Sequence, residues 1–231
     1  MVRSLSAVAV ALLGCATPGE PEPGEPDPGE PVIDERFDVV PDRAMWDFDF
    51  GTLDPNQGQP APSLRLFGDA AYFRLRVPLV FDHDAITASV DVASVFYETG
   101  TNSGNEYSTV GFSMETQAGV RAGVSLAVSY NVAPNTPTPG FPAGKLVRLY
   151  CPTGFAMSLP LPFDHTAWHR LHFAIDASGM TSKFDDLEIC HDPLVTELDG
   201  LAMLYVGTEQ RVRAGNEVVL LDNLKLYRTA P

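Results

Sequence analysis

Residues 168–176 read Trp-His-Arg-Leu-His-Phe-Ala-Ile-Asp, and this stretch decides the fold. From position 171 onward every second residue is a large apolar one, namely Leu171, Phe173 and Ile175. Successive side chains of a strand point to opposite faces, so this alternation puts one face in a core and the other in water. The stretch therefore predicts a strand of an antiparallel sheet with one solvated face.

Similar patterns occupy much of the chain. Alternation recurs at residues 46–50, 73–79 and 86–92. Apolar runs that suit bent strands, or strands buried on both faces, occupy residues 124–130, 145–150, 201–206 and 218–227. No window longer than ten residues carries an apolar helical stripe free of Pro and Gly. We therefore predict an all-β fold, a two-sheet antiparallel β-sandwich of jelly-roll type.

Three of these strands carry a family resemblance. Residues 47–53 look like the opening strand of bacterial concanavalin A-like and laminin G-like sandwich domains. Residues 168–176 are similar to the later strand of that family that reads W-H-x-L-x-F-x-x-D, and residues 220–227 resemble its closing strand. The resemblance implies one such domain over residues 32–231. The family includes glycan-binding modules, adhesion domains and some glycoside hydrolases, so the fold does not choose an activity.

The composition limits the partners. The 231 residues include 30 acids against 15 Lys and Arg, a formal net charge of −15. Nucleic acids and anionic membrane surfaces need clusters of Lys and Arg, which are absent, so we expect neither as a partner. Residues 32–231 carry 14 − 25 = −11 of this charge, because Arg3 contributes +1 and five acids at positions 20–30 contribute −5.

The N-terminus predicts export and lipidation. Residues 1–14 combine a positive start with an apolar stretch too short to span a bilayer, as in a signal peptide. Residues 12–15, Leu-Leu-Gly-Cys, resemble the lipobox of bacterial lipoproteins. The resemblance implies cleavage before Cys15 and acylation of its thiol, by palmitate or a similar chain. The alternative is an ordinary signal peptide with a chance cysteine. Because Ala16 is not acidic, the family rule favours the outer membrane.

Residues 15–31 follow as a tether. Pro-Gly-Glu-Pro recurs three times at a period of five. Proline rings fix φ and like charges repel, so the segment cannot form a core and spans up to roughly 50 Å. We expect a spacer that holds the sandwich off a membrane of the cell envelope, on its periplasmic or exterior side.

The remaining cysteines, Cys151 and Cys190, suit a disulfide in an oxidising compartment. The alternative is two unrelated buried thiols, because sequence does not place their Cα atoms.

One polar loop predicts a ligand site. Within residues 97–108 the candidate ligand-binding residues are the aromatic, amide and acidic ones, Tyr97, Glu98, Asn102, Asn105 and Tyr107. Sugars bind such mixtures, because an aromatic face covers the C–H surface of the ring while amides and carboxylates bond its hydroxyls. The alternative is a merely solvated rim.

The family resemblance also implies a structural calcium ion where the first and last strands meet. By motif position its ligands are Asp49, Asp222 and Asn223. Alternatively, the Asp-Asn pair simply bends the closing strand. A zinc site at His169 and His172 is disfavoured, because residues three apart on a strand face opposite sides.

A hydrolase of this fold needs paired carboxylates, often in the pattern E-x-D-x-x-E. The nearest match contains Asp186 and Glu188 but lacks the leading Glu, so we prefer a solvated turn there. No phosphate loop, zinc-helix motif or nucleophile elbow occurs.

The sequence also contains an internal repeat. Residues 78–85 and 160–167 are identical at six of eight positions. We interpret both as a shared turn built on Pro, Phe and Asp. The alternative is that His83 and His165, each beside an Asp, converge on one ligand or ion.

Together these observations predict an envelope lipoprotein that presents a non-catalytic binding module, with a glycan or envelope protein as partner. A polysaccharide-acting hydrolase and a structural or adhesive surface protein are the alternatives.

Overall fold

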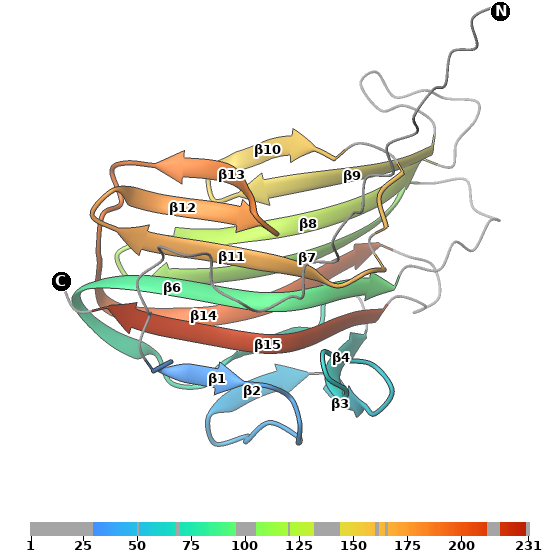
Figure 1. Cartoon of the computed structure of the whole chain (residues 1–231), viewed down its shortest axis with the longest axis horizontal. Helices are drawn as coiled ribbons and strands as arrows, with labels where there is room; N and C mark the ends of the chain where they lie inside the picture. The colour runs from blue at the N-terminus through green and yellow to red at the C-terminus, as the bar shows by residue number, and fades with distance from the viewer. Residues whose placement is uncertain are drawn as a thin grey trace, which may run out of the picture.

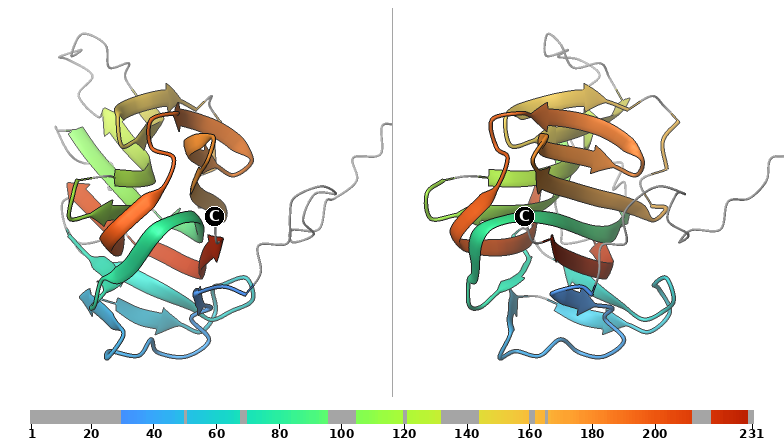
Figure 2. Two further views of the ribbon diagram at one scale, coloured as in Figure 1. Left: turned by 90° about the vertical axis from the view of Figure 1, so that its left-hand side faces the viewer. Right: turned by 60° about the vertical axis from the view of Figure 1, so that its left-hand side comes forward.

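The computed structural model describes residues 30–49, 51–67, 70–95, 105–119, 121–131, 144–159, 162–164, 166–211 and 218–229. All regular structure in these ranges is β-strand, arranged in two packed sheets (Figures 1 and 2). No helix described there has the length and apolarity needed to cross a bilayer. The expected signal peptide, Cys15 and most of the tether lie outside the described residues, as do Tyr97, Glu98 and Asn102.

Sheet A faces the viewer in Figure 1 and runs β3-β4-β15-β6-β11-β12-β13, and β1 pairs with the same edge of β15 as β4 but farther along it. All its pairs are antiparallel. Its strands are β1 (Ile33–Glu35), β3 (Gly51–Asp54), β4 (Ser63–Phe67), β6 (Leu79–Val95), β11 (His169–Asp176), β12 (Gly179–Phe184), β13 (Leu187–Asp192) and β15 (Val218–Thr229).

Sheet B lies behind it and runs β2-β5-β14-β7-β8-β9-β10. Its strands are β2 (Trp46–Asp49), β5 (Tyr72–Leu75), β7 (Asn105–Thr116), β8 (Arg121–Asn131), β9 (Gly144–Cys151), β10 (Gly154–Ser158) and β14 (Leu198–Arg211). Strand β6 links the sheets, because residues 79–84 pair with β14 and residues 85–95 pair with β15 or β11. His83, with φ of 54°, bends it at the irregularity within the pairing of β6 with β14.

The core lies between the sheets and uses the predicted alternation. Leu171, Phe173 and Ile175 of β11 are all fully buried. Across the interface the ring of Phe173 packs on Phe112 of sheet B, with 4.9 Å between centroids. The predicted jelly-roll sandwich is therefore confirmed.

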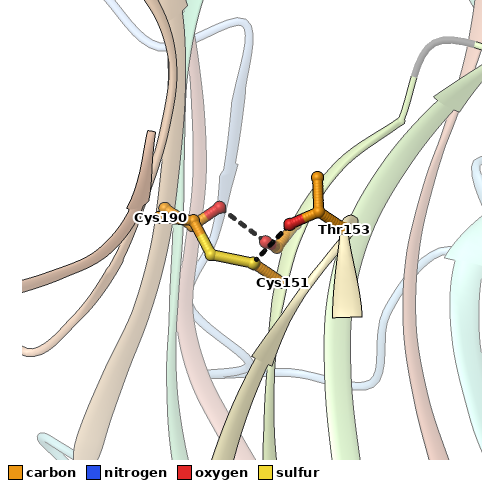
Figure 3. The surroundings of a disulfide bond; sticks show 5 residues. Cys151, Thr153 and Cys190 are labelled. Carbon is orange, nitrogen blue, oxygen red and sulfur yellow. Dashed lines mark hydrogen bonds between the residues drawn. A yellow bond between two sulfur atoms is a disulfide. The ribbon is translucent and has the colours of Figure 1, made fainter. Parts of the chain in front are cut away.

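A disulfide joins the two sheets at one edge (Figure 3). Cys151 ends β9 in sheet B and Cys190 lies on β13 in sheet A, with their Cα atoms 6.4 Å apart. Thr153 Oγ1 lies 3.2 Å from Cys151 Sγ. The predicted pairing of these cysteines is confirmed, and it fastens strands that no backbone hydrogen-bond ladder connects.

Two predicted boundaries were wrong. The alternation at residues 73–79 suggests one strand, but β5 ends at Leu75 and Val77 is exposed. Asn105 and Tyr107, which we assigned to a loop, are part of β7. Strand β7 extends this far because it pairs with both β8 and β14, and two ladders hold even a polar segment in strand conformation.

Candidate functional site

A groove of about 510 Å³ lies on the outer face of sheet B. It crosses β5, β14, β7 and β8 and reaches the β9–β10 turn at Cys151 and Pro152. Its lining includes the polar and aromatic side chains of Arg74, Ser113, Glu115, Arg121, Ser125 and Tyr205.

Strand alternation places these side chains outside the core. On β14, Leu204 and Val206 are buried, so Met203 and Tyr205 take the opposite face. Pairing then sets their neighbours, since Tyr205 stands opposite Arg74 of β5 and Ser113 of β7. Residues far apart in the chain thus form one row across the sheet.

The Tyr205 ring depends on a glycine. A Cβ atom on Gly207 would overlap with Cε1, Cζ and Oη of Tyr205, so the ring occupies the space where another residue would carry its side chain. The ring consequently lies along the sheet, with the residue 37% exposed. Burial raises the pKa of Tyr205, so its hydroxyl stays protonated at neutral pH and can both donate and accept hydrogen bonds.

The charged side chains around the groove are paired. Arg74 Nη2 lies 2.8 Å from Asp47 Oδ2, and this hydrogen bond lowers the pKa of Asp47. The Arg74 guanidinium also lies 4.9 Å from the centroid of the Tyr72 ring. At the other side, Arg121 Nη2 lies 2.6 Å from Glu115 Oε2. The arrangement offers hydrogen-bonding groups without a patch of one sign.

The groove lacks the carboxylate pair of a glycosidase. Among its described lining residues only Glu115 carries a carboxylate, and Arg121 pairs with it. Both inverting and retaining hydrolysis require two carboxyl groups across the scissile bond. Asp186 and Glu188 belong to the β12–β13 hairpin of sheet A, not to this sheet. The described lining of the groove therefore does not contain the paired carboxylates that hydrolysis requires.

Neighbouring Asp185 has a structural role together with His169. His169 Nδ1 lies 3.0 Å from Asp185 Oδ2, and its Nε2 lies 2.8 Å from the carbonyl oxygen of Asp164. Both partners accept, so the ring satisfies both only when it carries two protons. Burial works to lower the pKa of His169, but these hydrogen bonds outweigh it and the pKa is raised. His172, on the opposite face, has its pKa lowered by burial to about 4.

The predicted calcium ligands lie on two different sheets. Asp49 lies on β2 of sheet B and Asp222 on β15 of sheet A. Asp222 is buried and accepts hydrogen bonds from the backbone N–H groups of Gln59 and Asn223, while burial raises its pKa. Asn223 has φ of 48° at a bulge between β15 and β6, and its amide donates to Asp91 and Gln59. Each carboxylate oxygen of Asp222 thus accepts one N–H group, and the calcium site remains a prediction.

A different cluster of side chains has the spacing of possible metal ligands. Among the described residues, Asp82, His83 and Asp199 are the one set of three whose ligand atoms lie within 4.8 Å of one another. All three are exposed, and Glu197 Oε1, 2.8 Å from His83 Nδ1, raises the pKa of this histidine. His165, the proposed second member of the repeat, lies outside the described residues. The convergence of the two repeats remains a prediction.

The first copy of the repeat forms the bend of β6, with Phe81 buried. In the second copy, Phe163 and Asp164 precede β11 without strand structure, and Asp164 Oδ1 accepts a hydrogen bond from the N–H of Thr166. The two copies therefore share a sequence but not one conformation.

The predicted ligand residues and the groove differ in position. Asn105 and Tyr107 stand at the start of β7, opposite Asn131 and Ser129 of β8. The groove lies farther along the same strand, and sequence analysis missed its aromatic residue, Tyr205. Tyr205 lies in the apolar run at residues 201–206, which we interpreted as a bent strand or a strand buried on both faces, and the uniformly apolar residues of this run do not indicate which side chains face outward.

No protein-family model matches this chain, and no curated protein sequence matches it. Solved structures match its fold. The carbohydrate recognition domain of Emp47p superposes with a TM-score of 0.53 and 13% identity, over 80% of this chain and 89% of that chain. Peanut lectin gives 0.52 and 10%, over 85% and 97%. A GH16 protein of Bacteroides ovatus gives 0.51 and 9%, over 86% and 100%. These similarities show a concanavalin A-like jelly roll.

Proposed function

We propose that this protein is a non-catalytic carbohydrate-binding module whose ligand lies in the groove of sheet B. The observation that carries the proposal is the Tyr205 ring, laid along the sheet over Gly207 beside the hydroxyl groups of Ser113 and Ser125. A sugar presents an apolar C–H face and a rim of hydroxyls, so it needs an aromatic surface with polar groups around it. The groove supplies both.

A polysaccharide hydrolase is the second candidate, because an enzyme shares the fold with the lectins. The single carboxylate among the described lining residues, held by Arg121, favours binding over hydrolysis. A structural or adhesive role would not require the groove. Calcium is left out of the proposal, since Asp49, Asp222 and Asn223 are not among the described residues that line the groove.

A glycan array with the full chain tests the proposal, followed by calorimetry and an assay for released reducing ends. We expect specific binding without turnover. Tyr205→Ala should abolish binding, whereas Tyr227→Ala, a matched change on β15 of sheet A, should preserve it. Turnover of a bound glycan, or binding indifferent to Tyr205, would contradict the assignment.

We also propose that the module is an envelope lipoprotein, anchored through acylated Cys15 and held off the outer membrane by the Pro-Gly-Glu tether. The lipobox-like residues 12–15 and the adjacent low-complexity repeat support this proposal. Mass spectrometry of the mature N-terminal peptide should show lipid on Cys15, and Cys15→Ser should release the protein from membranes. An unmodified thiol at Cys15 would rule the anchor out.

A further inference from the structure

A second aromatic surface lies at the edge of sheet B. Phe155 of β10 stands opposite Tyr150 of β9, and their rings meet edge-to-face with centroids 5.9 Å apart. Leu149, the neighbour of Tyr150, is buried in the core, so Tyr150 and its partner take the outer face of the sheet. Phe155 is 59% exposed, and the Arg148 guanidinium lies 5.7 Å from its ring centroid.

This surface is in register with the groove. Gly207, over which the Tyr205 ring lies, pairs with Gly111 of β7, and Gly111 pairs with Ser125 of β8. Ser125 pairs with Tyr150, which pairs with Phe155. Between the two aromatic surfaces, the row therefore holds only glycine and serine.

The length of this row limits the ligand. Four strand-to-strand steps separate Gly207 on β14 from Phe155 on β10, so at about 4.8 Å per step the row spans about 19 Å. A single sugar ring cannot touch both ends of such a row. An extended chain lying across the strands can.

The charges limit the ligand further. Arg74 is paired with Asp47 and Arg121 with Glu115, so a neighbouring carboxylate offsets the positive charge that each would present to an acidic sugar. Residues 32–231 carry a formal charge of −11, which repels polyanions in general. A neutral polysaccharide chain is not repelled by the negative charge and does not need an unpaired cation.

We propose that Tyr150 and Phe155 form a second binding subsite, and that the ligand is a neutral, extended polysaccharide chain running from Tyr205 across β7 and β8 to Phe155. This inference rests on the proposed function. It adds a subsite at the sheet edge and a class of ligand. It also predicts that affinity depends on the length of the polysaccharide chain.

Calorimetry with the full chain tests this, using neutral gluco-, manno- and xylo-oligosaccharides of two, four and six units, and alginate oligosaccharides as anionic probes. For a neutral series that binds, we expect affinity to rise about tenfold or more from two to six units, because only the longer chain also reaches the aromatic rings of the second subsite. Phe155→Ala should lower the six-unit affinity to about the two-unit value and leave the two-unit affinity unchanged. Because Phe155 is exposed, this variant should keep the wild-type melting temperature.

The outcomes separate the two proposals. Equal affinity for two and six units, a Phe155→Ala variant with unchanged six-unit affinity, or preferred binding of alginate would overturn the extended neutral ligand while leaving carbohydrate binding intact. If no probe binds at any length and the glycan array is also blank, the proposed function itself fails.

Discussion

Removing the disulfide between Cys151 and Cys190 is the sharpest test of how this sandwich is held together. The bond joins β9 of sheet B to β13 of sheet A, and it closes a loop between residues 39 apart in sequence. Replacing both cysteines with alanine leaves the hydrogen-bond ladders of both strands in place. The change therefore isolates the covalent link.

The expected loss follows from the loop. In the chain-entropy model, a cross-link between residues 39 apart restricts the unfolded chain by about 4 kcal/mol at 25 °C. Natural domains have unfolding free energies of roughly 5 to 15 kcal/mol, so the double variant should still fold but with much of its margin gone. Val147 and Leu149 of β9 stay buried in the core and oppose complete release of this edge.

Urea unfolding followed by tryptophan fluorescence measures this loss, because Trp46 is buried and Trp168 is half-buried. With a slope of about 2 kcal/mol per molar urea, the midpoint should fall by about 2 M. Wild-type protein in reducing agent is the control and should match the double variant. A decrease below about 1 kcal/mol, or reduced wild type that differs from the variant, would refute the loop-entropy argument.

Three further changes test individual contacts. Gly207→Ala removes the space occupied by the Tyr205 ring, so glycan affinity should fall about tenfold by calorimetry, at an unchanged melting temperature. Arg170→Ala removes the guanidinium whose Nε lies 2.8 Å from buried Asp91, and the carboxylate left behind should cost about 2 kcal/mol in urea unfolding. His169 has a raised pKa in the fold, so its stabilisation is complete below about pH 6.5 and is lost as pH rises through the folded-state pKa. Wild type should thus lose stability relative to His169→Asn over that range, and parallel pH profiles would refute the doubly protonated ring.

Local periodicity was sufficient to predict the fold. The alternation around Phe173 and the apolar run at residues 218–227 both correspond to strands, β11 and β15. Strand β7 was missed although Val110, Phe112 and Met114 alternate within it, because the polar residues ahead of them suggested a loop. The start of this strand is polar, as its composition says, but composition does not show that β8 and β14 pair with it.

The site was less accessible to sequence analysis. Binding residues are often found in loops, so the prediction favoured residues 97–108 over strand faces. The groove instead uses residues on strands, including Tyr205 within the run at 201–206 and Ser113 on the strand β7 that was missed. The sequence does not show which residue of the neighbouring strand stands opposite each of these residues.

Long-range pairing is the property that makes this face a site. Asp47 neutralises Arg74 because β2 and β5 place them directly opposite, and Glu115 meets Arg121 in the same way across β7 and β8. The same ladders set Gly207 beside Gly111, which leaves room for an aromatic ring and an open floor. A slip of one residue in any of these pairs would turn every side chain of that strand to the other face. Strand register, more than loop composition, therefore decides which ligands this protein can bind.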